Sequence, residues 1–224
     1  MIVTMDGPAG SGKSTAAREL ARALGVAHLD TGATYRAVTL AALRGGVDLG
    51  DEAALAALAE AADIRFEPAA GRTRVLLDGE DVTDDIRSAA VSDHSHHIAA
   101  APAVRKVLVA LQRRMGADLA RRTGGVVAEG RDQGSVVFPD ADVKVYLDAA
   151  PEVRARRRTD ELLAAGENAD CEQVLAAILT RDRRDSTRSA DPMVKPEGAV
   201  VVDTSDKTIP QVTAELVRVV RGAG

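Results

Sequence analysis

The first fifteen residues constrain the fold more than any other stretch of this 224-residue chain. A short apolar run from Ile2 to Met5 leads into Gly7-Pro8-Ala9-Gly10-Ser11-Gly12-Lys13-Ser14, and an alanine-rich helical pattern follows at once. Strand, glycine loop and helix in this order, with every fixed position of G-x-x-x-x-G-K-S/T filled, are typical of a phosphate-binding P-loop. A chance glycine turn would need all of these coincidences together. The sequence therefore predicts a nucleoside triphosphate site.

Each residue type in this loop has its own physical task. Gly7, Gly10 and Gly12 let the backbone turn tightly and point its N–H groups inward, where the positive end of the following helix completes a cradle for anions. We expect the Lys13 ammonium to contact the β- and γ-phosphates of the nucleotide. The Ser14 hydroxyl is the expected ligand of Mg²⁺.

Composition narrows the class of protein. Hydrophobic residues make up 46% and charged residues 28%, which is typical of a globular chain. A net charge of −5, no Trp and 2% aromatic residues argue against binding to a nucleic acid polymer, either through a global positive field or through base stacking. The lone Cys171 is compatible with a reducing compartment, and no apolar run is long enough for a signal peptide or a membrane span. We expect a cytoplasmic monomer.

Short apolar segments separated by helical patterns predict an α/β fold with a five-stranded parallel sheet and helices on both faces. The expected strands are residues 2–5, 26–29, 126–128, 143–147 and 199–202. Residues 64–86 alternate in polarity around a predicted turn at 68–71, which indicates a small antiparallel hairpin unit. Residues 89–100 are short and polar, and Pro102 begins a long amphipathic helix. Ligands of such sheets bind at the carboxyl ends of the strands.

Arginines form the second informative pattern. A phosphoryl-transfer enzyme needs positive charge on the equatorial phosphate oxygens, and the planar guanidinium grips these oxygens bidentately. The alternative is a solvated helix face with surface ion pairs of little energy, but a P-loop in the same chain favours the catalytic interpretation. Helical periodicity places Arg154, Arg157 and Arg158 on one face. The other clustered arginines are Arg36 and Arg131 beside strand ends, and Arg181, Arg183, Arg184 and Arg188 near Asp182 and Asp185.

Together these motifs resemble those of the bacterial cytidylate kinases, relatives of the adenylate kinase group of P-loop nucleoside monophosphate kinases. The resemblance runs nearly end to end and implies one kinase domain over residues 1–224, with a monophosphate-binding insert at 35–104 and a lid at 149–168. The motifs that carry it are Asp6-Gly7-Pro8 with the P-loop, Asp30-Thr31-Gly32-Ala33-x-Tyr35-Arg36, Leu77-Asp78-Gly79-Glu80-Asp81-Val82, Pro102-x-Val104-Arg105, Glu129-Gly130-Arg131-Asp132, Val136-Val137-Phe138-Pro139-Asp140-Ala141, Arg154-Ala155-x-Arg157-Arg158, and Arg181-Asp182 through Arg188.

The resemblance implies transfer of the γ-phosphoryl group of ATP to CMP or dCMP, with Mg²⁺ as the metal. An aspartate that accepts from the 4-amino group repels a carbonyl oxygen, so it would separate cytosine from uracil. The implied transfer residues are Lys13, Arg131, Arg154, Arg158 and Arg188. The implied ATP contacts are Gly7, Gly10, Ser11, Gly12, Lys13, Ser14, Thr15 and Arg157. The implied CMP contacts are Asp30, Thr31, Tyr35, Arg36, His96, Arg105, Arg131, Asp132, Arg181, Asp185 and Arg188.

Two positions depart from the family pattern. His96 stands where a serine near the cytosine is usual, and Gln133 stands where an aliphatic residue or Met is usual. His94 and His97 crowd the same segment, but their spacing on a helix does not converge three imidazoles on a metal. A kinase of the same family with an altered base preference therefore remains an alternative.

Specific residues argue against other functions of P-loop proteins. A regulatory GTPase needs Asn-Lys-x-Asp, whereas the single asparagine, Asn168, precedes Ala169. A small-metabolite kinase, for example one acting on shikimate or gluconate, would not need the hairpin unit or the base contacts, and it stays the second alternative. Retention of Lys13, Arg131 and Arg188 argues against a non-catalytic nucleotide-binding module.

Overall fold

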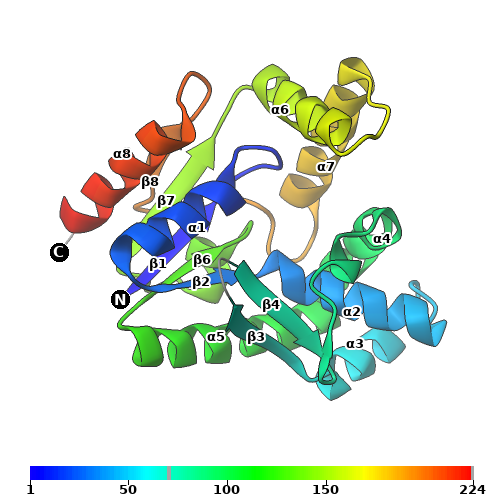
Figure 1. Ribbon diagram of the computed structural model, residues 1–224. Helices are drawn as coiled ribbons and strands as arrows, with labels where there is room; N and C mark the ends of the chain where they lie inside the picture. The colour runs from blue at the N-terminus through cyan, green and yellow to red at the C-terminus, as the bar shows by residue number, and fades with distance from the viewer. Residues whose placement is uncertain (70–71, 223–224) are drawn as a thin grey trace. The chain divides into compact units, whose positions relative to one another are not determined.

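The computed structural model describes residues 1–69 and 72–222 (Figure 1). Its contacts divide the chain into two compact units, Met1–His28 with Leu119–Gly224, and Leu29–Asp118. The segment predicted as the insert, residues 35–104, lies inside the second unit. The segment predicted as the lid, residues 149–168, lies inside the first unit, which also carries the P-loop.

Five short strands form the main sheet: β1 (Ile2–Asp6), β2 (Ala27–Asp30), β6 (Val126–Glu129), β7 (Val143–Asp148) and β8 (Val200–Asp203). Their order is β2-β6-β1-β7-β8, and β1 pairs in parallel with β6 and β7, as β7 does with β8. The register sets Met5 opposite Glu129, so the P-loop and the segment after β6 leave the sheet side by side. The predicted α/β class with a five-stranded parallel sheet is confirmed.

The core of the first unit joins this sheet to helices at both ends of the chain. These helices are α1 (Lys13–Leu24) and α8 (Ile209–Gly222), and the unit also contains α6 (Pro151–Ala164) and α7 (Cys171–Thr187). Buried Leu20 of α1 and Leu216 of α8 pack with Val3, Val145 and Val202 of the strands. These apolar contacts fix α1, and with it the loop that precedes it, on the sheet.

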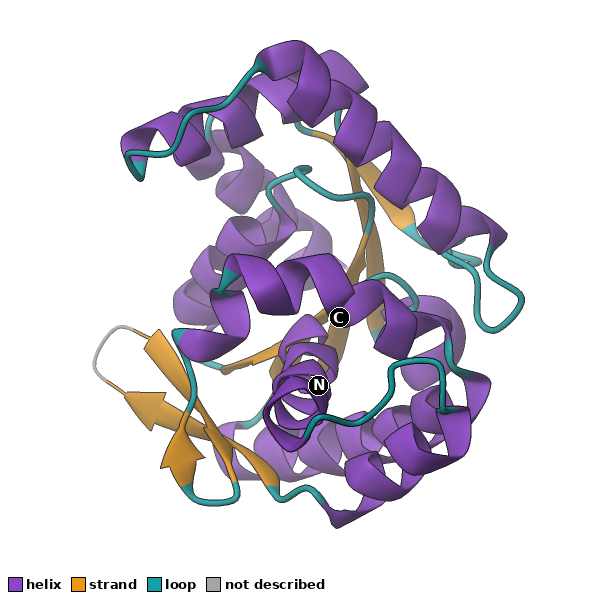
Figure 2. Cartoon of the chain, turned by 90° about the vertical axis from the view of Figure 1, so that its right-hand side faces the viewer, coloured by secondary structure: helices purple, strands orange, loops and turns teal. Residues whose placement is uncertain are grey.

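The second unit contains a separate small sheet (Figure 2). Its elements are α2 (Gly32–Gly45), α3 (Glu52–Ala61), β3 (Ile64–Ala69), β4 (Arg72–Leu77), β5 (Glu80–Asp81), η1 (Asp85–Arg87), α4 (Ala89–Ala100) and the first part of α5 (Pro102–Thr123). β3 and β4 pair in antiparallel, as do β4 and β5, so the predicted hairpin unit is confirmed. The predicted turn at 68–71 includes residues 70–71, which lie outside the described residues.

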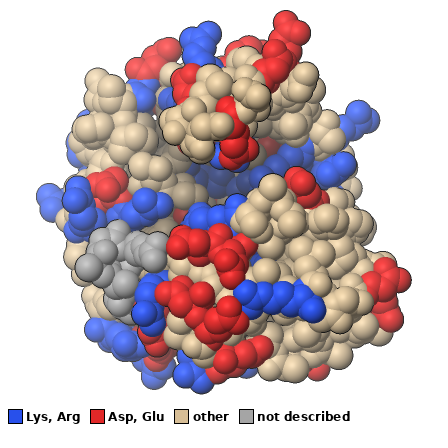
Figure 3. Space-filling model, turned by 45° about the vertical axis from the view of Figure 1, so that its right-hand side comes forward, with Lys and Arg blue, Asp and Glu red and all other residues tan. Residues whose placement is uncertain are grey.

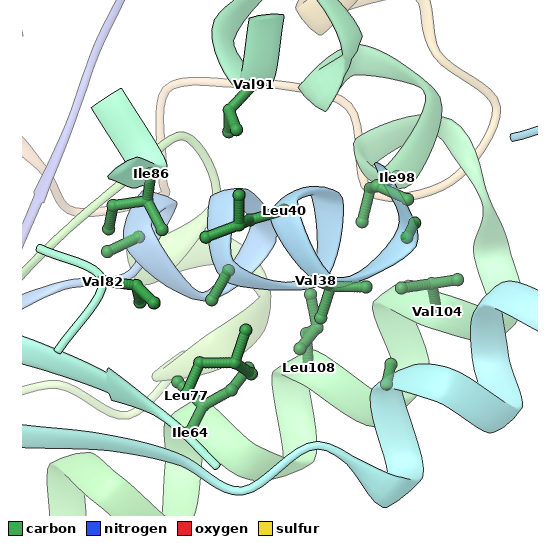
Figure 4. Packing of buried hydrophobic residues seen from close by; sticks show 14 of the residues in the cluster. Val38, Leu40, Ile64, Leu77, Val82, Ile86, Val91, Ile98, Val104 and Leu108 are labelled. Atoms are coloured by element: carbon green, nitrogen blue, oxygen red, sulfur yellow. The ribbon is translucent and has the colours of Figure 1, made fainter. Parts of the chain in front are cut away.

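Helix α2 lies at the centre of the second unit's core (Figure 4). Val38 of this helix packs in one cluster with Leu77 of β4 and Leu108 of α5. The segment expected to be short and polar forms the twelve-residue helix α4, whose buried Val91 and Ile98 anchor an otherwise polar sequence to this core. In the part of the chain that the structure describes, no helix has both the length and the apolar character needed to span a membrane.

Candidate active site

The loop between β1 and α1 has the backbone that its glycines predict. Gly7, Gly10 and Gly12 all have positive φ, of 143°, 74° and 85°. A Cβ at Gly7 would lie 2.0 Å from the Leu147 carbonyl oxygen, so this position has no room for a side chain. At Gly12 the backbone conformation alone favours glycine, since a Cβ there would meet no described atom within 4 Å. Helix α1 begins at Lys13, and the backbone N–H groups of its first turn, which have no carbonyl partner within the helix, point toward the loop.

Lys13 is folded over its own loop. Its Nζ donates to the Pro8 carbonyl oxygen at 2.7 Å and lies 3.4 Å from the Ser11 hydroxyl. Burial lowers the pKa of this ammonium well below its ordinary value, and the nearby positive charges of Arg131 and Arg181 lower it further. Such an ammonium gains strongly from any anion placed beside it, because little water solvates its charge.

Ser14 belongs to a short chain of polar contacts that sequence reasoning did not predict. Its hydroxyl donates to Glu129 Oε2 at 2.7 Å, and His28 Nε2 lies 3.0 Å from the other carboxylate oxygen. Glu129 ends β6 and is only 4% exposed. An acidic residue at the end of the strand beside the P-loop was a signal present in the sequence.

The donor set at this point suits Mg²⁺. A serine hydroxyl and a carboxylate are the hard oxygen ligands that this ion prefers, and it commonly takes only one or two protein ligands plus water and phosphate oxygens. Among the residues described, no group of three or more His, Cys, Asp or Glu side chains is arranged to hold a metal ion alone. Ser14 and Glu129 are the residues that fit a metal shared with a bound phosphate.

Asp6 fastens the segment after β6 to the end of β1. Its two carboxylate oxygens accept from the backbone N–H groups of Gln133 and Gly134, each at 2.7 Å. Burial raises the pKa of Asp6 to about 6 despite these hydrogen bonds. The adjacent charge of Asp132 raises this pKa as well. Asp6 was quoted in the family motif but was not predicted as a site residue.

Four predicted site residues come together in two ion pairs. Arg131 Nε donates to Asp185 Oδ2 at 3.0 Å, and Arg188 Nη2 donates to Asp132 Oδ2 at 3.3 Å. Arg188 also donates to the Asp191 carbonyl oxygen at 2.7 Å. Helix α7 and the segment that follows it therefore bring their charges to the segment after β6, which is more than fifty residues away in the sequence.

The three arginines predicted on one face of α6 contact three different parts of the first unit. Arg154 is 4% exposed and binds Asp182 Oδ2 at 2.5 Å, with further hydrogen bonds to the carbonyl oxygens of Ala9 and Ala149. Arg157 donates to Thr204, in the loop after β8. Exposed Arg158 pairs with Glu161, one helical turn along α6. Arg154 thus joins the P-loop to α6 and α7.

In the second unit, the predicted monophosphate residues lie around the start of α2. Arg36 pairs with Asp30 at 2.7 Å, and Asp30 also accepts from the Ala33 N–H at 3.2 Å. The guanidinium of Arg105, which is 1% exposed, lies 5.6 Å from the Tyr35 ring centroid. A cation at this distance over an aromatic face is stabilised by the ring quadrupole. Thr31 lies beside them at the N-terminal end of α2.

His96, a predicted CMP contact, lies on helix α4. It is exposed, its Nδ1 lies 2.7 Å from the Asp93 carbonyl oxygen of its own helix, and its ring is 4.1 Å from that of His97. On the face shown in Figure 3, both basic and acidic side chains lie at the surface. The positive charges of the first unit are therefore local features of a chain whose net charge is −5.

A glycine loop with its lysine, between a strand of a parallel sheet and a helix, defines the class of P-loop nucleotide-binding proteins. The solved structures show the same fold. TT1252 from Thermus thermophilus has a TM-score of 0.51 at 19% identity, covering 99% of this chain and 96% of that one. An uncharacterized protein from Eubacterium ventriosum has a TM-score of 0.53 at 9% identity, covering 99% and 98%.

Sequence comparison identifies the family. The family model for cytidylate kinase matches residues 3–222. Cytidylate kinase of Pelotomaculum thermopropionicum is 49% identical over 96% of this chain and 93% of that protein. Cytidylate kinase of Rhodococcus opacus is 49% identical over 98% and 94%. The chain belongs to the cytidylate kinase family.

Proposed function

We propose that this protein transfers the γ-phosphoryl group of ATP to CMP or dCMP, yielding CDP or dCDP and ADP. The observation that carries the proposal is the arrangement in the first unit, where the P-loop lysine and two acid-paired arginines, Arg131 and Arg188, lie at the carboxyl ends of the strands. The relatives described above carry the name of the same activity.

The ATP phosphates are held by the backbone N–H groups of the loop and by Lys13. Ser11, Ser14 and Thr15 add hydroxyl groups around the same phosphates, with Ser14 as the Mg²⁺ ligand. Bound Mg²⁺ supplies neutralisation of phosphate charge. Arg131 and Arg188 stabilise the negative charge that develops on the transferring phosphoryl group. Phosphoryl transfer depends mainly on such electrostatic stabilisation and on the alignment of the two nucleotides.

The lid at residues 149–168 contributes two kinds of arginine. Exposed Arg158 and partly exposed Arg157 approach ATP by exchanging their present contacts with Glu161 and Thr204, whereas buried Arg154 acts through the P-loop backbone that it binds. We propose that these segments, with the insert at residues 35–104, belong to one kinase domain that works as a monomer.

CMP is recognised by three groups of residues. Arg36, fixed by Asp30, binds the CMP phosphate together with Arg131 and Arg188. Arg105 and Asp132 read the cytosine edge, and the Asp132 carboxylate accepts from the 4-amino group. Arg181 and Asp185 bind the ribose. Thr31, Tyr35 and His96 complete the list of proposed CMP contacts.

A coupled assay of ADP formation with CMP, dCMP, UMP, AMP and GMP tests the proposal. CMP or dCMP should give the highest kcat/KM. A higher value for UMP would support the alternative of an altered base preference at His96 or Gln133 and would overturn the assignment of cytosine. Activity with shikimate or gluconate and none with any nucleoside monophosphate would place the chain among the small-metabolite kinases.

A further inference from the structure

Three side chains from three elements of the first unit form one line of hydrogen bonds: Ser14 in the first turn of α1, Glu129 at the end of β6, and His28 on β2. The Ser14 hydroxyl lies 2.7 Å from Glu129 Oε2, and His28 Nε2 lies 3.0 Å from Glu129 Oε1. The side chains of Glu129 and His28 are only 5% and 13% exposed. Contacts between groups so shielded from water are stronger than the same contacts on a surface.

We propose that His28 is a positioning residue, which holds the Glu129 carboxylate in the orientation that prepares Ser14 for Mg²⁺. The inference rests on the proposed function, because it concerns the metal that accompanies the nucleotide. His28 itself touches neither nucleotide nor metal in this proposal. It acts only through Glu129.

The chemistry of the hydroxyl explains why the orientation matters. A serine hydroxyl has one proton to donate and two lone pairs that accept or coordinate. Because Glu129 takes the proton of Ser14, the lone pairs of Oγ point away from the carboxylate and stay available to a cation. A hydroxyl whose proton had no fixed acceptor would have to be reoriented each time that metal binds.

The carboxylate in turn needs a second fixed point. A glutamate side chain rotates about three bonds, and fixing a long side chain in one rotamer costs about 1.5–2 kcal/mol of conformational entropy. The contact with Ser14 holds one oxygen only. The Nε2–H of His28 holds the other oxygen, so the carboxylate plane is fixed before any ligand arrives. Residues that fix metal ligands in this indirect way typically change metal affinity about 10- to 100-fold when they are replaced.

The test measures equilibrium binding of ADP to the full-length protein by calorimetry, once with excess Mg²⁺ and once with EDTA. The ratio of the two dissociation constants reports how well the site couples the metal to the nucleotide. For His28→Phe, which keeps the ring but removes the donor, we expect this ratio to fall about tenfold while the affinity for metal-free ADP stays constant. His28→Gln places an N–H near the position of Nε2 and should restore most of the ratio.

Two further variants sharpen the comparison. Glu129→Gln should lower the ratio at least as much as His28→Phe, since it removes the group through which His28 acts. His94→Phe makes the same chemical change on α4 and should leave the ratio unchanged; the His94 ring contacts its own helix at the Ala90 carbonyl oxygen. Thermal unfolding of each variant checks that the fold is retained.

Several results would overturn the proposal. An unchanged ratio in His28→Phe with a collapsed ratio in Glu129→Gln would show that Glu129 is held without His28. An equal loss in His28→Phe and His28→Gln would assign His28 a packing role instead of a hydrogen-bonding one. A failure of the proposed function itself would look different, because the unaltered protein would then bind no ADP with or without Mg²⁺.

Discussion

Asp6 gives the sharpest test of how the site is built, because its carboxyl is almost completely buried and still ionisable near neutral pH. Its pKa in the folded protein is about 6, against an ordinary value of 3.8. Between these two pH values the folded state binds more protons than the unfolded state. The contribution of Asp6 to the free energy of unfolding therefore falls as pH rises from about 4 to about 6.

The size of this effect follows from the shift in pKa. A difference of one pKa unit corresponds to about 1.4 kcal/mol. Because the carboxyl of the unfolded chain is already more than half ionised at pH 4, ionising Asp6 lowers the stability of the fold by roughly 2 kcal/mol between pH 4 and pH 7. The two hydrogen bonds from the N–H groups of Gln133 and Gly134 offset part of the burial penalty and are already included in this value.

The variant Asp6→Asn isolates the contribution. Urea unfolding is measured at intervals from pH 4 to pH 7 for both proteins, and the difference in the free energy of unfolding is plotted against pH. The Asn amide has a single acceptor oxygen, so it can accept from only one of the two backbone N–H groups. At low pH the unaltered protein should therefore be more stable than Asp6→Asn by about 1–3 kcal/mol.

The slope of this plot tests whether burial raises the pKa of Asp6. The advantage of the unaltered protein should shrink by roughly 2 kcal/mol as pH rises from 4 to 7. Asp140→Asn makes the same change at an exposed position and sets the background of the comparison. A difference that is constant with pH, or that grows with pH, would refute the reasoning that burial dominates the environment of Asp6.

Four other substitutions test the loop and the arginine pairs. Gly7→Ala should destabilise the fold by about 3 kcal/mol, because its Cβ would collide with the Leu147 carbonyl oxygen. Gly12→Ala should destabilise it by only about 1–2 kcal/mol, because the backbone conformation alone disfavours a side chain there. Chemical denaturation measures the free energy of unfolding of both variants. Asp132→Ala should reduce kcat/KM for CMP about 100-fold or more and leave ATP binding nearly intact, and equal losses would exclude its base-reading role. Arg188→Ala should lower kcat at saturating substrates about 100-fold or more, and an unchanged turnover would remove Arg188 from the site.

Local sequence signals were enough to predict the parallel sheet, the P-loop and the hairpin unit. Glycine spacing and short apolar strands are encoded within a few residues, and the structure confirms the sheet and the hairpin unit. Residues 89–100 could be described from the sequence only as short and polar, because only Val91 and Ile98 of the twelve residues of α4 are buried and no continuous apolar stripe marks the helix. Its stability comes from packing against α2, which a single segment does not reveal.

The polar partners of the P-loop could not be predicted from local sequence signals. Ser14 meets Glu129 and His28 because β6 lies between β1 and β2 in the sheet, although the chain reaches β6 long after β2. Asp6 meets Gln133 for the same topological reason. Periodicity predicted Arg154, Arg157 and Arg158 on one helix face, but it could not predict that Arg154 and Arg157 contact the loops at Ala9 and Thr204.

The acidic partners of the arginines explain how a chain of negative net charge builds a site for polyanions. Burial lowers the pKa of Lys13 and the positive charge of Arg131 lowers it further, so positive charges gathered here need compensation nearby. Asp185 and Asp132 provide it at hydrogen-bond distance. A phosphate that binds to Arg131 or Arg188 must therefore compete with a carboxylate, and the affinity of the site reflects the difference between two anions. Neutralising Asp185 should thus tighten binding of phosphate groups at Arg131 even while it removes a proposed ribose contact.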